Sequence, residues 1–132
     1  MAKGEGHMSL LLASIASAIA VIWGIAHLIP THNVIVGFGD LSKDNRLVIT
    51  QEWIAEGVTL IFLGILVGVV TVIGWVSSPV VAIVYTLAAA ILLIMTMLTA
   101  LTGARGSVAF FKICPLLKTV TAVLLLISMI LH

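Results

Sequence analysis

Apolar residues fall into four long blocks along the chain, separated by short polar stretches and one longer connection. The blocks cover about residues 9–30, 50–74, 79–102 and 112–132. Each holds roughly 20 residues, the length of α-helix that crosses a hydrocarbon core about 30 Å thick. Backbone inside lipid must satisfy its own hydrogen bonds, and the strand-like alternation of a β-barrel is missing from the sequence. The pattern therefore predicts an all-α, integral membrane four-helix bundle.

The predicted bundle is one domain over residues 9–132, and a polar tail over residues 1–8, either native or left by cloning, is not part of it. Between the second and third blocks, the short stretch from Trp75 to Pro79 predicts a tight turn and antiparallel neighbours. The connection 31–49 is long and partly apolar, so we expect it to be ordered against the bundle as a lid. Within it, Ser42 or Asp44 is expected to cap a helix that continues into the second block.

Composition supports a membrane protein and excludes several other classes. Hydrophobic residues make up 62% of the 132 residues and charged residues 8%, more apolar surface than a soluble domain of this size can bury. The net charge of +1 provides no basic surface for nucleic acid. Cys114 is the single cysteine, which excludes an intrachain disulfide. We expect it to act as a small apolar residue at a helix start.

The positions of lysine and arginine predict the orientation, because cytoplasmic connections carry an excess of both. Two of these residues lie in the first connection and two around the third, whereas the opposite side has only Lys3. The four are Lys43, Arg46, Arg105 and Lys112. Connections 31–49 and 103–111 are therefore expected in the cytoplasm, with both termini outside, in a multi-pass protein of the cell membrane.

Polar residues of all four blocks gather near this predicted cytoplasmic end. Glu52 and Glu56 are spaced i, i+4 and share one helix face. Glu56 and Lys118 each lie about six residues, or roughly 9 Å, inside their blocks from the same boundary. A charge at that depth is costly unless it is paired, so we expect an ion pair between them. The alternatives are that Glu52 and Glu56 are interfacial and that Lys118 extends to the headgroups.

The predicted ligand-binding residues are Trp23, His27, Glu52, Glu56, Thr96, Thr99 and Lys118. His27 is included because an imidazole in lipid needs a partner and histidine suits proton handling, although it also lies one turn before Pro30, near the interface. Two histidines and two carboxylates could suit a metal in principle, but Pro30 separates His27 from His32 and the sequence has no HExxH motif. We predict no metal site, and the sequence assigns no cofactor.

Aromatic and small residues predict how the helices are placed. Trp53 and Trp75 are expected to be interface anchors, as is Tyr85, whereas Trp23 is expected to line the bundle interior. Small residues at four-residue spacing mark faces where helices approach closely or form a homodimer. They are Ala16, Ala20, Gly24, Gly64 and Gly68.

Three segments carry a resemblance to a known family. The first block ends in Trp23–Pro30, the second has Glu56 followed by Gly57, and the third leads through Met95–Arg105 into a basic connection. In these features the chain resembles the DoxX-like group of small four-span bacterial and archaeal membrane proteins. The resemblance implies links to quinones, thiol stress or respiratory accessory roles. Glu56 is the one residue to which it assigns a functional role. The loop from Gly37 to Asp40 has no counterpart in this pattern.

The predicted function is binding of a lipid-soluble molecule, quinone-, sterol- or isoprenoid-like, in a polar pocket of the cytoplasmic leaflet. Three alternatives stay open. One is an accessory or structural subunit of a larger membrane complex. Another is a proton-coupled small-molecule transporter, working as a homodimer with Glu56 as the proton carrier. The last is a membrane enzyme with Glu56 and His27 as its acid and base.

The predicted orientation can be tested by cysteine labelling in intact cells. If the first connection is cytoplasmic, a membrane-impermeant thiol reagent should label Ser78→Cys from outside and should leave Ser42→Cys unlabelled. Labelling of Ser42→Cys but not of Ser78→Cys would reverse the orientation. Labelling of both after the cells are opened provides the control for thiol accessibility.

Overall fold

A computed structural model describes residues 3–73, 78–106 and 109–131 of the chain. These residues form α1 (Lys3–Leu28), α2 (Thr31–Gly37), α3 (Lys43–Ile73), α4 (Pro79–Leu101), the short 3-10 helix η1 (Gly103–Arg105) and α5 (Ala109–Ile130). Within the described residues, α1, α3, α4 and α5 are long and apolar enough to cross a membrane. The predicted all-α four-helix membrane bundle is confirmed, and the protein is a multi-pass membrane protein.

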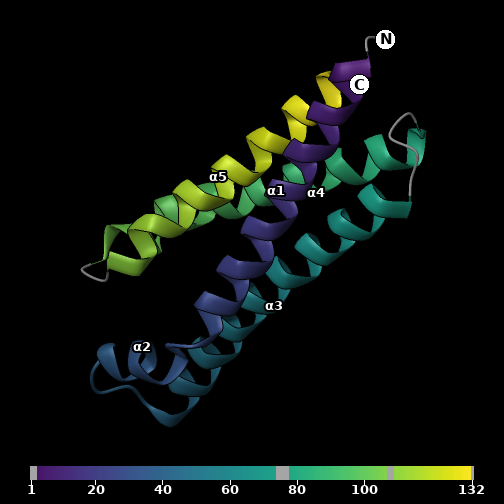
Figure 1. The fold of residues 1–132 in the computed structure, drawn as a ribbon. Helices are drawn as coiled ribbons and strands as arrows, with labels where there is room; N and C mark the ends of the chain where they lie inside the picture. The colour runs from purple at the N-terminus through teal and green to yellow at the C-terminus, as the bar shows by residue number, and fades with distance from the viewer. Residues whose placement is uncertain (1–2, 74–77, 107–108, 132) are drawn as a thin grey trace.

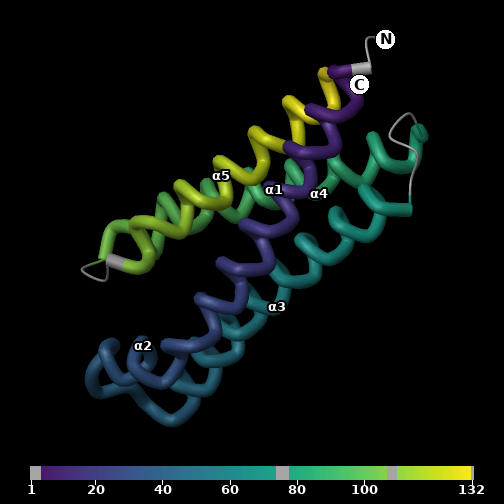
Figure 2. Tube along the Cα trace, viewed as in Figure 1, coloured from purple at the N-terminus to yellow at the C-terminus, as the bar shows by residue number. Residues whose placement is uncertain are grey.

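The four long helices are arranged as two antiparallel pairs (Figure 1). α1 packs along α3, α4 packs along α5, and α1 and α5 form the main seam between the two pairs. At one end of this seam the first turns of α1 and the last turns of α5 lie side by side (Figure 2). There the hydroxyls of Ser9 and Ser128 each donate to the other residue's carbonyl oxygen, at 2.8 and 2.9 Å. These polar groups satisfy each other inside the seam.

The helix boundaries agree with the predicted spans at some ends and differ at others. α1 ends at Leu28, just before Pro30, but it begins at Lys3 and so includes most of the predicted tail. α3 begins at Lys43, ahead of the predicted start near residue 50, and the Ser42 hydroxyl accepts from the Asn45 amide at 3.2 Å, as expected of a cap. A helix of 31 residues is about 46 Å long, which exceeds a 30 Å hydrocarbon core, so α3 extends beyond it.

The connection after α1 is ordered, as predicted. Its first part is the helix α2, which packs against α3 by burying Val34 and Ile35 beside Trp53. Phe38, which follows α2, is partly exposed and lies at the α3–α4 side of the bundle. Residues 74–77, which include most of the predicted tight turn with Trp75, lie outside the described residues.

Glycines allow α1 and α3 to pack closely, as the small-residue spacing predicts. A Cβ added at Gly64 would lie 2.6 Å from the Val21 side chain and 2.8 Å from the backbone oxygen of Ser17. The Ser17 hydroxyl also donates to the carbonyl of Gly64 at 2.7 Å, a contact that needs this short distance between the helices. The α1–α3 pair is therefore held by backbone-to-backbone packing.

Gly64→Ala should lower the thermal stability of the protein in detergent. The added methyl group would force α1 and α3 apart, and overpacking of this kind typically costs about 1–3 kcal/mol. Gly37→Ala is the matched control, since a Cβ there meets no atom within 4 Å. If both variants melt at the wild-type temperature, the close α1–α3 contact is not formed in solution.

Candidate functional site

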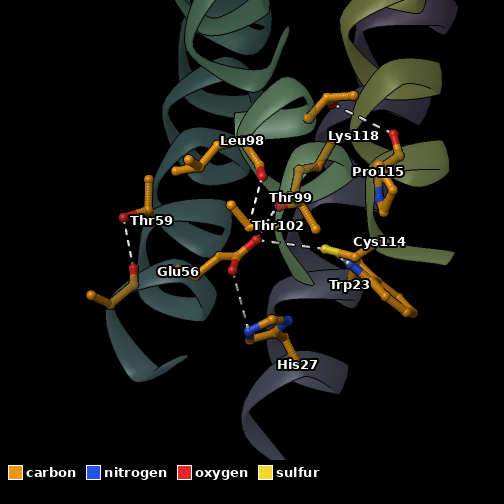
Figure 3. A network of polar contacts seen from close by, with 12 residues as sticks. Trp23, His27, Glu56, Thr59, Leu98, Thr99, Thr102, Cys114, Pro115 and Lys118 are labelled. Carbon is orange, nitrogen blue, oxygen red and sulfur yellow. Dashed lines mark hydrogen bonds and ion pairs between the residues drawn. The ribbon is translucent and has the colours of Figure 1, made fainter. Parts of the chain in front are cut away.

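One buried ion pair connects three of the four long helices. Lys118 on α5 donates to the Glu56 carboxylate on α3 and to the Thr99 hydroxyl on α4, the latter at 2.7 Å (Figure 3). The Lys118 side chain is fully buried, whereas that of Glu56 is 23% exposed. The ion pair predicted from equal depth is therefore confirmed, and Lys118 does not extend to the headgroups. A buried ammonium without this carboxylate would be strongly destabilising.

His27 on α1 lies next to the same carboxylate. Its Nε2 is 3.9 Å from Oε2 of Glu56, within ion-pair range but too far for a hydrogen bond. The imidazole is 1% exposed, and neither ring nitrogen has a hydrogen-bond partner among the described residues. Such groups usually find partners when they are buried. The contacts of His27 thus leave a polar ring without protein partners beside Glu56.

Trp53 fixes the position of His27, and its predicted role as an interface anchor is wrong. The Trp53 ring is buried, stacks on the imidazole with centroids 3.8 Å apart, and donates its N–H to the His27 carbonyl at 2.9 Å. The sequence places Trp53 near the start of a membrane span, where tryptophan is common in the headgroup region. Here α2 and the first residues of α5 cover that position, and the ring turns inward.

Cys114 joins the network from α5, although its single occurrence at a helix start predicts a purely apolar role. Its thiol donates to Oε1 of Glu56 at 3.6 Å and accepts from the Trp23 indole N–H at 3.3 Å. Trp23 in turn stacks on Phe110 with centroids 4.7 Å apart, which agrees with its predicted interior position. The spacing of Cys114 and Lys118, i and i+4 on one helix face, is the signal that could have indicated this.

A cavity of about 570 Å³ lies between α3 and α4, on the outer side of the network. Its walls are mostly apolar, and Glu52 and Glu56 are its ionisable residues within the described part of the chain. It is lined by Phe38, Val48, Ile49, Glu52, Trp53, Ala55, Glu56, Thr59, Ile91, Met95, Leu98, Thr99, Thr102, Gly103 and Phe111. Glu56 therefore belongs both to the buried network and to the cavity wall.

The predicted site residues divide into two groups. His27 and Lys118 contact Glu56 directly, Trp23 is linked to it through Cys114, and Thr99 is linked to it through Lys118. The other two predicted residues lie apart from it. Glu52 is exposed and lines the cavity one turn from Glu56, and the Thr96 hydroxyl points to the Pro115 carbonyl at 3.5 Å.

Tyr85 is a second buried polar residue whose predicted interfacial position is wrong. It is 1% exposed, and its hydroxyl lies 2.6 Å from that of Thr71, which links α4 to α3 near the Ile73 end of the hairpin. At the other end of the same two helices lies the cavity. Among the described residues, no group of three or more histidine, cysteine or acidic side chains could hold a metal ion.

No family model, curated protein or solved structure matches this chain. The resemblance to DoxX-like proteins stays a prediction, and the function is inferred from the geometry of the chain itself.

Removing either partner of the ion pair should destabilise the protein, and removing both should cost much less than the sum. Glu56→Gln leaves the buried ammonium unpaired, a loss on the order of 3–5 kcal/mol. Lys118→Met should cost less, because Glu56 is partly exposed at the cavity. The double variant should recover much of the stability, and thermal unfolding of the four proteins in detergent measures this coupling.

Glu52→Gln is the matched control for this cycle, since it makes the same chemical change one turn away on the same helix. Glu52 is exposed and takes part in no ion pair among the described residues, so its replacement should change stability by no more than about 0.5 kcal/mol. Simple addition of the Glu56 and Lys118 effects would show that the two side chains do not interact.

Proposed function

We propose that the protein binds a lipid-soluble small molecule in the cavity between α3 and α4. The observation that carries the proposal is the position of Glu56, a carboxylate held by an ion pair to the buried Lys118 in the wall of a mostly apolar cavity. Ligand sites typically combine apolar walls with a few fixed polar groups, and ionisable residues inside membranes are functional candidates. Quinone-, sterol- and isoprenoid-like molecules have the required combination of a polar head and an apolar tail.

The apolar walls support a route of entry from the lipid. Ile91 and Leu98 on α4 line the cavity and are also large apolar residues with exposed side chains. We infer that this exposed apolar face contacts lipid tails, so that the cavity opens toward the bilayer. A lipid-soluble molecule would then reach it without crossing water.

The hydrogen bonds around Glu56 support a role for this residue in holding the polar head. Lys118 and Cys114 both donate to Oε1, so Oε2 is the oxygen with capacity to accept from a ligand. His27 lies on the Oε2 side at 3.9 Å, and its two ring nitrogens have no hydrogen-bond partner among the described residues. A hydroxyl group of the ligand could donate to Oε2, whereas His27 is buried and does not line the cavity.

A proton-coupled transporter is the second candidate, and one observation favours it. His27 and Glu56 place two titratable groups in contact inside the membrane, as in proton relays. Transport would require the same cavity, so a test of the cavity bears on both functions. The predicted homodimer and the cytoplasmic position of the cavity are part of this proposal.

Ala55→Phe should abolish ligand binding by filling the cavity that Ala55 lines. Mass spectrometry of organic extracts from protein purified in mild detergent should find a lipid-soluble molecule with the wild type and not with this variant. Ala100→Phe is the matched control, since Ala100 is exposed on α4 and does not line the cavity. Identical extracts from all three proteins would contradict the proposed function.

A further inference from the structure

The charges around the cavity indicate which head group it favours. The ionisable residues that line it, within the described ranges, are the carboxylates of Glu52 and Glu56. Lys118 lies behind Glu56, fully buried, and neutralises that carboxylate. Glu52 has no such partner in the part of the chain that the structure describes. The cavity therefore carries one carboxylate, that of Glu52, which has no ion-pair partner among the described residues.

His27 does not supply the missing positive charge. A protonated imidazole would hold two N–H groups, and both ring nitrogens are buried without an acceptor within hydrogen-bond distance. Burying unpaired donors of a charged group is costly, so these contacts favour the neutral ring. A neutral His27 adds no positive charge, so it does not offset the negative charge of Glu52.

Aromatic rings complete the lining near these carboxylates. Phe38, Trp53 and Phe111 all line the cavity, and Phe111 packs edge-on against both Trp53 and Phe38, with centroids 5.2 and 6.3 Å apart. The faces of aromatic rings attract organic cations, and this attraction increases where water is excluded. A cavity lined by an unpaired carboxylate and several aromatic rings suits an ammonium-type head group and disfavours an anion.

We propose that the ligand of this cavity is a hydrophobic monovalent organic cation, such as an amine or quaternary ammonium compound with apolar substituents. The inference rests on the proposed function and narrows its ligand class. The cationic centre lies between Glu52 and the aromatic rings, where it compensates the unpaired carboxylate. The apolar substituents occupy the space between α3 and α4 along Ile91, Met95 and Leu98.

Tetraphenylphosphonium and tetraphenylborate test this directly, because the two ions have nearly the same shape and opposite charge. Equilibrium dialysis of the purified protein in detergent, with empty micelles as reference, measures the binding of each. The phosphonium should bind, and the borate should bind at least about tenfold more weakly. Ala55→Phe should remove the phosphonium binding, which shows that it occurs in the cavity.

Glu52→Gln should weaken phosphonium binding by about tenfold, the effect of losing roughly 1.4 kcal/mol. Asp44→Asn is the matched control, since it removes the same charge from an exposed position on α3 that does not line the cavity. It should leave the affinity within about twofold, because Asp44 is exposed and lies eight residues, or roughly 12 Å, from Glu52 along α3, where salt largely screens its charge.

The cation proposal is overturned if both ions bind equally, if neither binds, or if Glu52→Gln and Asp44→Asn have the same effect. Its failure is distinguishable from that of the proposed function. If a neutral molecule co-purifies with the wild type and is lost in Ala55→Phe, the cavity is a binding site for uncharged ligands. If Ala55→Phe changes neither the extract nor the binding of either ion, both proposals fail.

Discussion

The pairing of Lys118 with Glu56 is the constraint on which the arrangement of this bundle depends. A fully buried ammonium in a lipid-embedded protein must be compensated, and the compensating carboxylate comes from the opposite helix pair. Thr99 adds a third helix to the same contact. Because α3 and α4 are otherwise linked by Thr71 and Tyr85 near the other end, this pair fixes how far the helices are separated where the cavity lies.

The same constraint explains why a carboxylate can be present in an apolar wall at all. One carboxylate oxygen of Glu56 pairs with the buried Lys118, and Glu56 also lines the cavity. Its negative charge is therefore stabilised while the carboxylate stays accessible from the cavity. The stacking of His27 on Trp53 then places a polar ring without protein partners at the remaining oxygen. Stability and the capacity to bind a polar group thus come from the same few side chains.

The sequence predicts the features that depend on depth and spacing, and it fails on those that depend on rotation about a helix axis. The length of the apolar blocks predicts the four spans, and the equal depth of Glu56 and Lys118 predicts their ion pair. The spacing of the glycines predicts the close contact between α1 and α3. The predicted interfacial positions of Trp53 and Tyr85 are wrong, and the polar contacts of Cys114 are not predicted. The three errors have a common reason. Helices that contact lipid are apolar on every side, so the sequence carries little amphipathic signal to show which face is buried.

The Ser9–Ser128 contact has a consequence for chain connectivity. It places the beginning of α1 beside the end of α5, so the four long helices form a closed cycle in which each is adjacent to the next. The same arrangement of helices could therefore be reached by a chain that starts at a different helix. A permuted chain in which a short linker joins the end of α5 to the start of α1, and which is opened at the exposed turn around Gly39, would keep every contact between the long helices.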